Sequence, residues 1–286
     1  MRCSEWPTQS AGETVKLLGV DIELDIQDPQ LASMLRLLWA DCDPPFGLGA
    51  TSPPPSSAAA IQVKGDNPWV VSIGNAQTSA WSRSAALSLV LAGLNAAAIA
   101  GTPHLALHCA VVARGGRAIA LPARSGRGKT TTTAALLQQG WEYVSDEVLA
   151  LSWTDGTVTG YPRPLSLSPW AAATLGVHEG LDADGETVLT AGQLGSRAVA
   201  VTEPVVVDAV VLLERAVGRC EDSGELVPAS AAEAITQLLP RCFNHFHDPA
   251  RTLELLTDLV ATTEVTSFRL GHPTRSAQTL GAWLDR

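Results

Sequence analysis

The hydrophobic pattern of the first forty residues predicts a strand followed by a helix. Residues 15–26, VKLLGVDIELDI, alternate apolar and polar positions in their second half, which is typical of a half-buried strand. Asp28 followed by Pro29 is a favourable helix start, and apolar residues then recur at helical spacing up to Leu38. We therefore expect a strand and an amphipathic helix at the start of the fold.

A run rich in Pro, Gly and Ser then interrupts the pattern. Residues 43–58, DPPFGLGATSPPPSSA, cannot sustain helical or ladder hydrogen bonds and predict a loop or linker. Residues 59–65 and 68–74 read as two short strands joined by a turn. Residues 84–101 are long and apolar, but their Ser and Asn residues and their helical spacing fit a core helix better than a bilayer span. We expect residues 1–101 to form a strand-and-helix lobe.

From Leu105 onward the chain alternates strands and helices. Residues 105–112 and 117–122 are apolar runs separated by an Arg-Gly-Gly turn, which favours a hairpin. A glycine-rich stretch follows, then a helix that ends at Gly140, and then further strands within residues 141–153. Strand, glycine-rich loop, helix and strand in this order are typical of an α/β nucleotide-binding unit.

The remainder of the chain continues this alternation. Residues 205–213 predict a buried strand, and three segments predict amphipathic helices: 229–240, 248–261 and 275–284. The sequence therefore indicates an α/β (α+β) fold built on a mixed sheet. Two domains are expected, with residues 102–286 as the larger and catalytic one.

Composition and charge narrow the functional classes. Apolar residues make up 46% of the 286 residues and charged residues 17%, which excludes disorder as the overall state. The 19 basic and 29 acidic residues give a net charge of −10. Nucleic acids and anionic membranes both require a cationic surface, so we expect neither as a partner.

Cysteine usage indicates a reducing compartment. The chain has five cysteines, an odd number, scattered without a CxxC pair, so a disulfide framework is not expected. The N-terminal residues, MRCSEWPTQS, lack the apolar core of a signal peptide. A cytoplasmic location is the resulting expectation.

One stretch, ARSGRGKT at residues 123–130, carries the candidate chemistry and is here named the glycine loop. It matches the phosphate-loop pattern G-x-x-x-x-G-K-[ST] at seven of eight positions. Ala123 replaces the first glycine, whose backbone geometry is often one that alanine tolerates less well. The predicted strand before the loop and the helix after it are the context that chance matches usually lack.

The residue types of the glycine loop suit a phosphate site. Gly126 and Gly128 let the backbone turn so that successive N–H groups face phosphate oxygens. Lys129 places an ammonium between the β- and γ-phosphates, and the Thr130 hydroxyl can ligate Mg²⁺ near the positive end of the helix dipole. The sequence therefore predicts ATP and Mg²⁺ as cofactors, with these nucleotide contacts: Ser125, Gly126, Arg127, Gly128, Lys129, Thr130 and Thr131.

Two carboxylates follow at a suitable distance. Asp146 and Glu147 lie at the end of the next predicted strand, sixteen residues after Thr130, which allows a helix, a turn and a strand to return beside the loop. One carboxylate can hold Mg²⁺ together with Thr130 while the other accepts a proton from an incoming hydroxyl. The residues alone do not decide which carboxylate has which role.

Two further residues are candidates for the site. His108 lies within an apolar strand, where an isolated histidine is more often a satisfied core residue than a catalytic one. Arg163 lies between two prolines, from where it can reach a phosphate or an acidic peptide, and the sequence leaves this substrate-binding role open.

The stretch LHCAVV, the glycine loop and the pattern L-L-x-x-G-x-x-x-x-S-D-[DE] together resemble HPr kinase/phosphorylase. The chain is more similar still to the shorter relatives of that enzyme, which include kinases of lasso-peptide precursors. The resemblance is specific over residues 107–147 and weak elsewhere. It implies a fold akin to phosphoenolpyruvate carboxykinase, with a phosphate loop set in a mixed sheet, and transfer of the ATP γ-phosphoryl group to a serine hydroxyl.

The resemblance also implies roles for individual residues. His108 corresponds to a histidine close to the transferred phosphate. Asp146 and Glu147 align with an Asp-Asp pair that shares metal binding and proton acceptance, and the longer arm of Glu147 makes Asp146 the safer choice as base. Hexamers of the related enzyme suggest self-association. The glycine-rich segment tied to the reverse, phosphorylase reaction has no convincing match, so neither that reaction nor HPr as a substrate is expected.

Three functions remain open from the sequence. The first is a Mg·ATP-dependent kinase acting on Ser or Thr of a ribosomally made peptide or small protein. The second is a small-molecule hydroxyl kinase of the same fold, and the third is a nucleotide-binding regulator without catalysis. The carboxylate pair favours an enzyme, because a regulator needs no proton acceptor beside the γ-phosphate.

The segment RCFNHFHD has the residue types of a metal site. Cys242, His245 and His247 are metal-ligand types, but their spacing does not place three ligands on one helical face, and no fourth is evident. A structural zinc site is therefore not expected.

Overall fold

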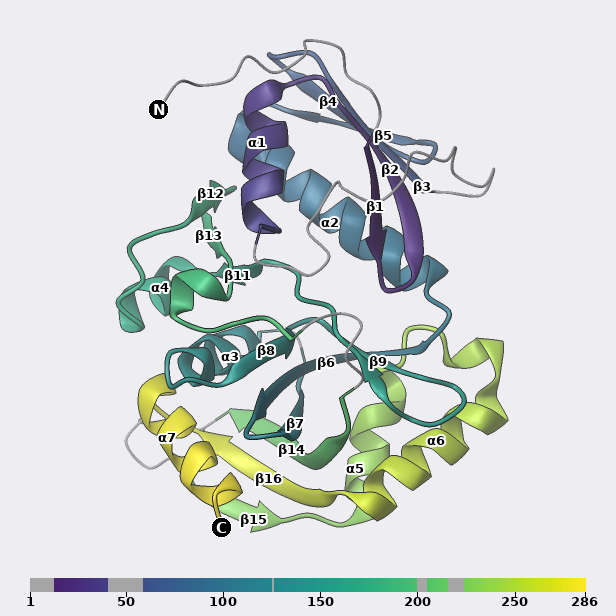
Figure 1. Ribbon diagram of the computed structural model, residues 1–286, viewed down its shortest axis with the longest axis vertical. Helices are drawn as coiled ribbons and strands as arrows, with labels where there is room; N and C mark the ends of the chain where they lie inside the picture. Colours follow the sequence, from purple (N-terminus) through teal and green to yellow (C-terminus); the bar gives the residue numbers. More distant parts are fainter. Residues whose placement is uncertain (1–12, 41–58, 125, 200–204, 216–223) are drawn as a thin grey trace.

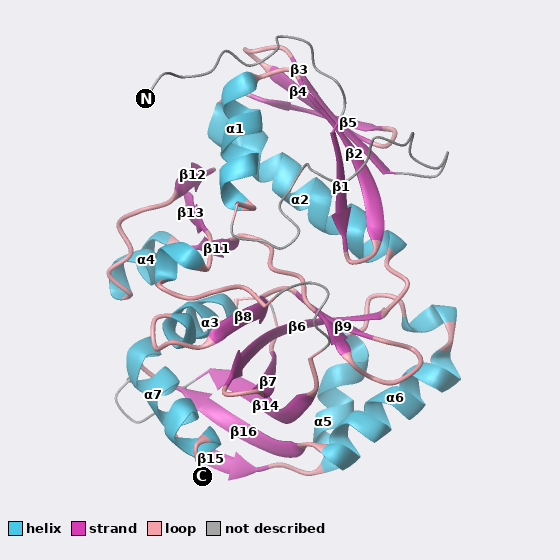
Figure 2. Cartoon of the chain, viewed as in Figure 1, coloured by secondary structure: helices cyan, strands magenta, loops and turns pink. Residues whose placement is uncertain are grey.

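The structure of the protein is a computed structural model that describes residues 13–40, 59–124, 126–199, 205–215 and 224–286 (Figures 1 and 2). It has a mixed α/β fold with three sheets, which contain both parallel and antiparallel strand pairs. The α/β class expected from the sequence is thereby confirmed. The Pro/Gly/Ser-rich run at 43–58 and three of the five cysteines, Cys3, Cys42 and Cys220, lie outside the described residues.

The first sheet is formed by residues that precede α2. Its order is β1-β2-β3-β4-β5, with β2 and β3 parallel and the other neighbours antiparallel. Helices α1 (Pro29–Leu38) and α2 (Arg83–Gly101) accompany it. The strands are β1 (Glu13–Leu17), β2 (Val20–Ile26), β3 (Ala59–Lys64), β4 (Trp69–Ile73) and β5 (Ala76–Ala80).

Two expectations for this region need correction. The single strand predicted over residues 15–26 is a hairpin of β1 and β2, because Leu18 and Gly19 both adopt left-handed backbone angles (φ +49° and +82°). Leu18 is buried despite its place in the turn, so the apolar pattern continues through it and conceals the break. Strand β5, AQTSA, was not predicted, because its first four residues are exposed and carry no hydrophobic alternation.

Helix α2 packs on this sheet. Its buried residues include Leu87, Val90, Leu94 and Ala98, which recur at helical spacing. By length and composition alone, α2 is the one helix among the described residues that could cross a membrane. Its contacts with β2, β3, β4 and β5 are those of a helix in a protein core.

Asp28 ties three elements of this region together. Its Oδ1 caps α1 by accepting hydrogen bonds from the backbone N–H groups of Gln30 (2.9 Å) and Leu31 (3.0 Å). Its Oδ2 accepts from Trp69 Nε1 at 2.9 Å on β4 and from Arg83 Nε at 3.0 Å on α2. One buried carboxylate therefore joins both helices to the sheet.

Replacing Asp28 with alanine is expected to lower the free energy of unfolding by about 2–4 kcal/mol, since a helix cap and charge-assisted hydrogen bonds are lost together. Urea denaturation measures the change. Asp66→Ala, at an exposed turn position, is the matched control and should stay within about 0.5 kcal/mol of the parent protein. A loss at Asp28 no larger than that of the control would contradict the assignment.

The second sheet has eight strands and lies below the first in Figure 1. Its order is β10-β9-β6-β7-β14-β16-β15, with β8 also paired to β6. The run β7-β14-β16 is parallel and the other pairs are antiparallel. The strands are β6 (Leu105–Arg114), β7 (Arg117–Pro122), β8 (Glu142–Ser145), β9 (Val148–Leu151), β10 (Val158–Thr159), β14 (Val207–Arg215), β15 (Leu226–Pro228) and β16 (Glu264–Leu270).

Helices cover both faces of this sheet. Ile119 and Leu121 of β7 pack with α3 (Lys129–Leu137) and α7 (Pro273–Leu284), whereas Ala118 and Ala120 of the same strand pack with α5 and α6. This alternation follows from the period of two in a strand. The other helices are α4 (Pro169–Thr174), α5 (Ala231–Leu238), α6 (Pro249–Thr262) and the short 3₁₀ turns η1 (Gly192–Leu194), η3 (Leu239–Arg241) and η4 (His245–His247).

Most of the longer predicted elements of this region are confirmed. The β6–β7 hairpin turns at Gly115 and Gly116, β14 covers most of the predicted strand at 205–213, and α5, α6 and α7 match the three predicted helices. Strands β15 and β16 were not predicted, nor was the small sheet β11-β13-β12 formed by β11 (Leu165–Leu167), β12 (Leu181–Ala183) and β13 (Glu186–Leu189).

The two larger sheets share hydrophobic contacts. One cluster of buried side chains includes Val90 and Leu94 of α2 together with Ala106 of β6 and Val148 and Ala150 of β9. The domain boundary predicted at residue 101 stays a prediction. Among the described residues, the hydrophobic cluster continues across this position.

Candidate functional site

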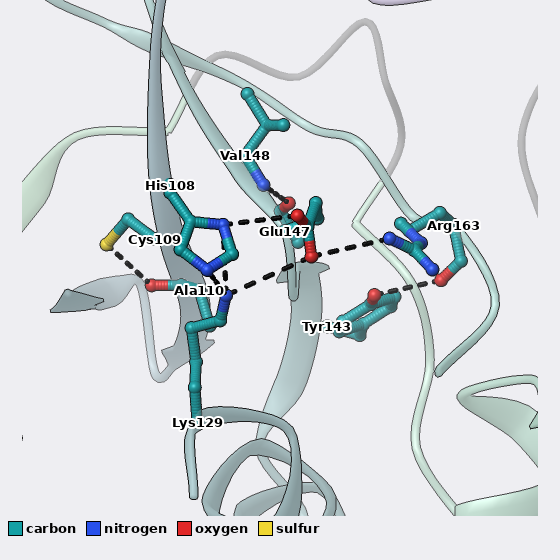
Figure 3. Close-up of polar contacts among 9 residues, drawn as sticks. His108, Cys109, Ala110, Lys129, Tyr143, Glu147, Val148 and Arg163 are labelled. Atoms are coloured by element: carbon teal, nitrogen blue, oxygen red, sulfur yellow. Dashed lines mark hydrogen bonds and ion pairs between the residues drawn. The ribbon is translucent and has the colours of Figure 1, made fainter. Parts of the chain in front are cut away.

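Five predicted site residues come together from four separate segments, and Figure 3 shows four of them: His108, Lys129, Glu147 and Arg163. His108 comes from β6, and Lys129 is the first residue of α3. Asp146 and Glu147 form the turn between β8 and β9, and Arg163 lies just before β11. The structure thus places beside one another residues that the sequence separates by up to 55 positions.

Local hydrogen bonds set the position of the carboxylate turn. The Ser145 hydroxyl accepts from the backbone N–H of Val148 at 3.1 Å, which closes the turn between β8 and β9. The backbone N–H of Cys109 donates to the carbonyl of Glu147 at 3.1 Å and holds the turn against β6. The carboxylates are therefore fixed beside the strand that carries His108.

His108 bridges the lysine and the glutamate. Its Nε2 lies 2.9 Å from Lys129 Nζ, and its Nδ1 lies 3.1 Å from Glu147 Oε1. Because an ammonium group can only donate, Nε2 acts as the acceptor, and the tautomer with the proton on Nδ1 satisfies both contacts. This contact network, rather than core packing, accounts for a histidine in an apolar strand.

Glu147 is the centre of the charge network. Its Oε2 lies 3.9 Å from Lys129 Nζ and 3.4 Å from Arg163 Nη1, in addition to the His108 contact. Burial alone would raise the pKa of this carboxyl, but the hydrogen bond from His108 and the charges of Lys129 and Arg163 outweigh it and lower the pKa to about 2. Glu147 is therefore ionised at any physiological pH.

The lowered pKa of Glu147 predicts a pH-dependent contribution to stability. The pKa of Glu147 is about 2 in the folded protein, below its ordinary value of 4.5. The stabilisation is therefore present in full above pH 4.5, and it is lost as the pH falls through the pKa of the folded state. We expect Glu147→Gln to lower the free energy of unfolding by roughly 2 kcal/mol at neutral pH, and the deficit to shrink as the pH falls below about 4.

Urea titrations of both proteins at several pH values test this expectation. Glu179→Gln is the matched control, because Glu179 is exposed and its loss should leave stability nearly unchanged at every pH. A deficit for Glu147→Gln that stayed constant down to strongly acidic pH would contradict the proposed electrostatic origin.

Asp146 lies in a different environment from its neighbour. Its side chain is only 5% exposed, and its Oδ1 has no hydrogen-bond partner among the described residues. Burial raises the pKa of this carboxyl, against the opposing effects of the Lys129 charge and the Thr130 hydroxyl. A buried carboxylate oxygen without a partner is rare in folded proteins, and a bound cation or hydrogen-bond donor would satisfy this one.

The glycine loop leads from the end of β7 into α3. Gly126 and Gly128 have φ angles of +73° and +92°, the left-handed region in which glycine is favoured. No side chain caps α3 at Gly128, which leaves N–H groups of its first turn available to an external acceptor. Ala123 is buried and adopts no left-handed angle, so alanine is accommodated at this position without strain.

The remaining predicted contacts divide into three groups. Thr130 and Thr131 are half-buried on the first turn of α3, and the former interacts with Asp146. Arg127 is exposed on the loop. Ser125 lies outside the described residues.

Arg163 lies within the site and is held there by its backbone. Its carbonyl accepts the hydroxyl of Tyr143 at 2.8 Å, and the neighbouring Tyr161 pairs with Ser145 in an isolated parallel bridge. Because its guanidinium pairs with Glu147, Arg163 helps to anchor this carboxylate, a role that the sequence analysis did not assign to it.

One neighbour of the site was missed. The ring of Phe243 contacts His108 edge-on, with ring centroids 5.9 Å apart, and Phe243 is 39% exposed. The sequence analysis considered this segment only for its Cys and His residues. A Phe-Asn pair within a polar segment has no periodicity that would mark it as a neighbour of β6.

Comparison with known proteins adds no identification. No protein-family model matches the chain, and no curated protein matches it.

Proposed function

We propose that the protein is a Mg·ATP-dependent kinase that transfers the γ-phosphoryl group to a Ser or Thr hydroxyl, on a ribosomally made peptide of the lasso-precursor type or on a small protein. We further propose that the sheet around the glycine loop is a phosphate-loop core akin to that of phosphoenolpyruvate carboxykinase. The observation that carries the proposal is the buried, partly unpartnered Asp146 beside Lys129 and Thr130.

The glycine loop supports nucleotide binding. It follows the parallel strand β7 and precedes α3, so the uncapped N–H groups and the positive helix end face the position of a phosphate chain. Lys129 lies at this end of the helix, and its ammonium contacts His108 and Glu147. A bound triphosphate would offer the ammonium a more strongly charged partner.

The residues beside the loop suit Mg²⁺. Thr130 and Asp146 would hold the ion, since a hydroxyl and a carboxylate oxygen are hard ligands of the type that Mg²⁺ prefers. The unpartnered Oδ1 of Asp146 is the atom that such an ion would satisfy. When bound, Mg²⁺ neutralises the charge that develops on the β- and γ-oxygens.

The two carboxylates differ in their surroundings. Burial raises the pKa of Asp146, whereas the His108 hydrogen bond and the neighbouring cations hold that of Glu147 at about 2 despite burial. Because Glu147 is committed to these contacts, Asp146 would receive the proton of the acceptor hydroxyl, through the carboxylate oxygen that does not hold Mg²⁺. Glu147 orients His108 and Lys129 and balances their charge.

The acceptor is proposed from the resemblance to peptide kinases and from one feature of the surface. Phe243 is 39% exposed, and its ring lies against His108. An exposed aromatic ring beside a candidate reacting residue favours an acceptor with apolar side chains, such as a peptide. A small polyol would gain little from this ring.

A transfer assay tests the proposed function. The purified protein is incubated with radiolabelled Mg·ATP and three acceptor classes: Ser/Thr peptides that include any precursor peptide encoded beside its gene, small proteins, and small hydroxyl compounds. We expect label on a peptide hydroxyl, located by phosphopeptide mass spectrometry, and no transfer when Mg²⁺ is chelated. Label only on small molecules would favour the metabolite kinase. ATP binding without transfer to any acceptor would favour the regulator.

A further inference from the structure

At the start of β6, the connection between α5 and α6 takes the place of β7 as the neighbouring chain. In the β6–β7 ladder Cys109 pairs with Pro122, so a continued antiparallel register would place residue 124 opposite Leu107. Leu107 instead forms an antiparallel bridge with Cys242. The glycine loop therefore leaves the sheet just after Pro122, and the chain around Cys242 occupies the vacated edge.

Hydrogen bonds fasten this connection to β6. The backbone N–H of Phe243 donates to the carbonyl of Ala106 at 2.8 Å. Asn244 accepts from the backbone N–H of Ala106 at 3.0 Å through Oδ1 and donates to the carbonyl of His104 at 2.8 Å through Nδ2. Asn244 is buried, so the segment 242–244 is held in register directly beside the strand that carries His108.

This arrangement brings Arg241 to the start of the glycine loop. Arg241 ends η3 and immediately precedes the bridge residue Cys242, while Arg124 follows the point at which the loop leaves β7. Burial and the charge of Arg124 together lower the pKa of Arg241, and the charge of Arg241 acts on the buried Cys109 thiol. The bridge from Cys242 to Leu107 places the backbone of Arg241 one residue from this contact with β6.

These cations lack acidic partners in the described part of the chain. Among the described residues, no carboxylate lies within ion-pair distance of Arg124, Arg127 or Arg241. Arg241 donates from Nη1 to the carbonyl of Gln237, and its Nε is buried without a hydrogen-bond partner. Neighbouring guanidinium groups repel one another, and an anion between them removes this repulsion. The unpaired charges of Arg124 and Arg241 at one end of the candidate phosphate site therefore favour an anion there.

We infer that Arg241 is a further phosphate-contacting residue, which binds the terminal phosphate of the nucleotide from the β6 side of the glycine loop. The inference rests on the proposed function, because it takes a nucleotide as the ligand of the loop. In the proposed reaction the acceptor hydroxyl approaches beside His108 and Asp146, so the terminal phosphate of the nucleotide lies at this end of the site. Arg241 is anchored next to the same part of β6 and is therefore nearest to that phosphate. A guanidinium there would stabilise charge on the transferred group.

Nucleotide binding by Arg241→Gln tests the inference, with calorimetry for Mg·ATP, Mg·ADP and Mg·tripolyphosphate. We expect the dissociation constant for Mg·ATP to rise roughly ten- to a hundredfold, as for loss of a charge-assisted hydrogen bond, and that for Mg·ADP to rise less than about threefold. Arg241→Lys should recover part of the loss. Arg286→Gln, at the exposed C-terminus, removes the same charge and should bind both nucleotides as the parent protein does.

The outcomes separate this inference from the proposed function. Equal losses for Mg·ATP and Mg·ADP, or no loss, would overturn the assignment of Arg241 while leaving the kinase proposal intact. If the parent protein binds Mg·ATP in an Arg241-dependent manner but transfers no phosphoryl group, the kinase proposal fails and the phosphate contact stands. If the parent protein binds none of the three ligands, both are overturned. Melting temperatures of each variant exclude misfolding as the cause of a loss.

Discussion

Replacing Lys129 with methionine is expected to lower the rate of phosphoryl transfer by about a thousandfold or more, since one preorganised charge on the transferred group is commonly worth that much. Lys129 lies at the N-terminal end of α3 and is only 6% exposed, and its ammonium contacts both His108 and Glu147. Methionine keeps a similar length without the charge. Initial rates with saturating Mg·ATP and the best peptide acceptor measure the effect.

The Lys129→Met result needs a control for structure. Loss of the ammonium removes one of the cations that balance Glu147, so some loss of stability is expected and is followed by the melting temperature. Lys129→Arg keeps the charge and separates the two effects, because it should preserve stability better than activity. Lys64→Met, at an exposed position, should leave transfer unchanged. Transfer by Lys129→Met within about tenfold of the parent rate would contradict the proposed site.

Replacing Asp146 with asparagine is expected to lower phosphoryl transfer by about a hundredfold or more while raising the stability of the folded protein. The activity falls because asparagine cannot receive the acceptor proton. Stability rises because burial raises the pKa of Asp146, so the charged form is less favourable in the folded than in the unfolded protein. The pKa of Asp146 is higher in the folded protein than in the unfolded protein. The destabilisation therefore develops as the pH rises through the pKa of the unfolded state, and it is complete above the pKa of the folded state.

Two measurements on Asp146→Asn examine these opposite effects. Transfer rates should fall, and urea midpoints should rise at neutral pH and approach those of the parent protein in acid. Asp66→Asn, at an exposed turn, should change neither quantity. Full transfer activity in Asp146→Asn would remove this residue as the base. A loss of stability at neutral pH would contradict the account of its environment.

Local signals in the sequence were sufficient for the elements around the site. The Arg-Gly-Gly turn, the glycine loop and the apolar runs beside them predicted β6, β7 and α3 within a few residues. The sixteen-residue interval from Thr130 to Asp146 correctly placed a turn at the end of β8. These features depend on neighbours in sequence, for which periodicity and turn chemistry are informative.

Features that depend on distant pairing were not available from the sequence. Strand β16 completes the parallel run β7-β14-β16, yet its segment EVTSFRL mixes exposed and buried positions and was not predicted as a strand. The bridge between Leu107 and Cys242 joins positions 135 residues apart, and no local pattern marks it. The ion pair of Arg163 with Glu147 likewise arises from the path of the chain after β10. Such contacts follow from tertiary packing rather than from propensity.

The hydrophobic cluster that joins α2 to β6 and β9 limits how the molecule can be dissected. A chain that began at Thr102 would expose Ala106, Val148 and Ala150 to water on the same strands that carry His108 and adjoin Glu147. Apolar surface left uncovered in this way promotes aggregation and loosens the strands beneath it. Helix α2 and the sheet on which it packs therefore cover one side of the strands that carry His108 and adjoin Glu147.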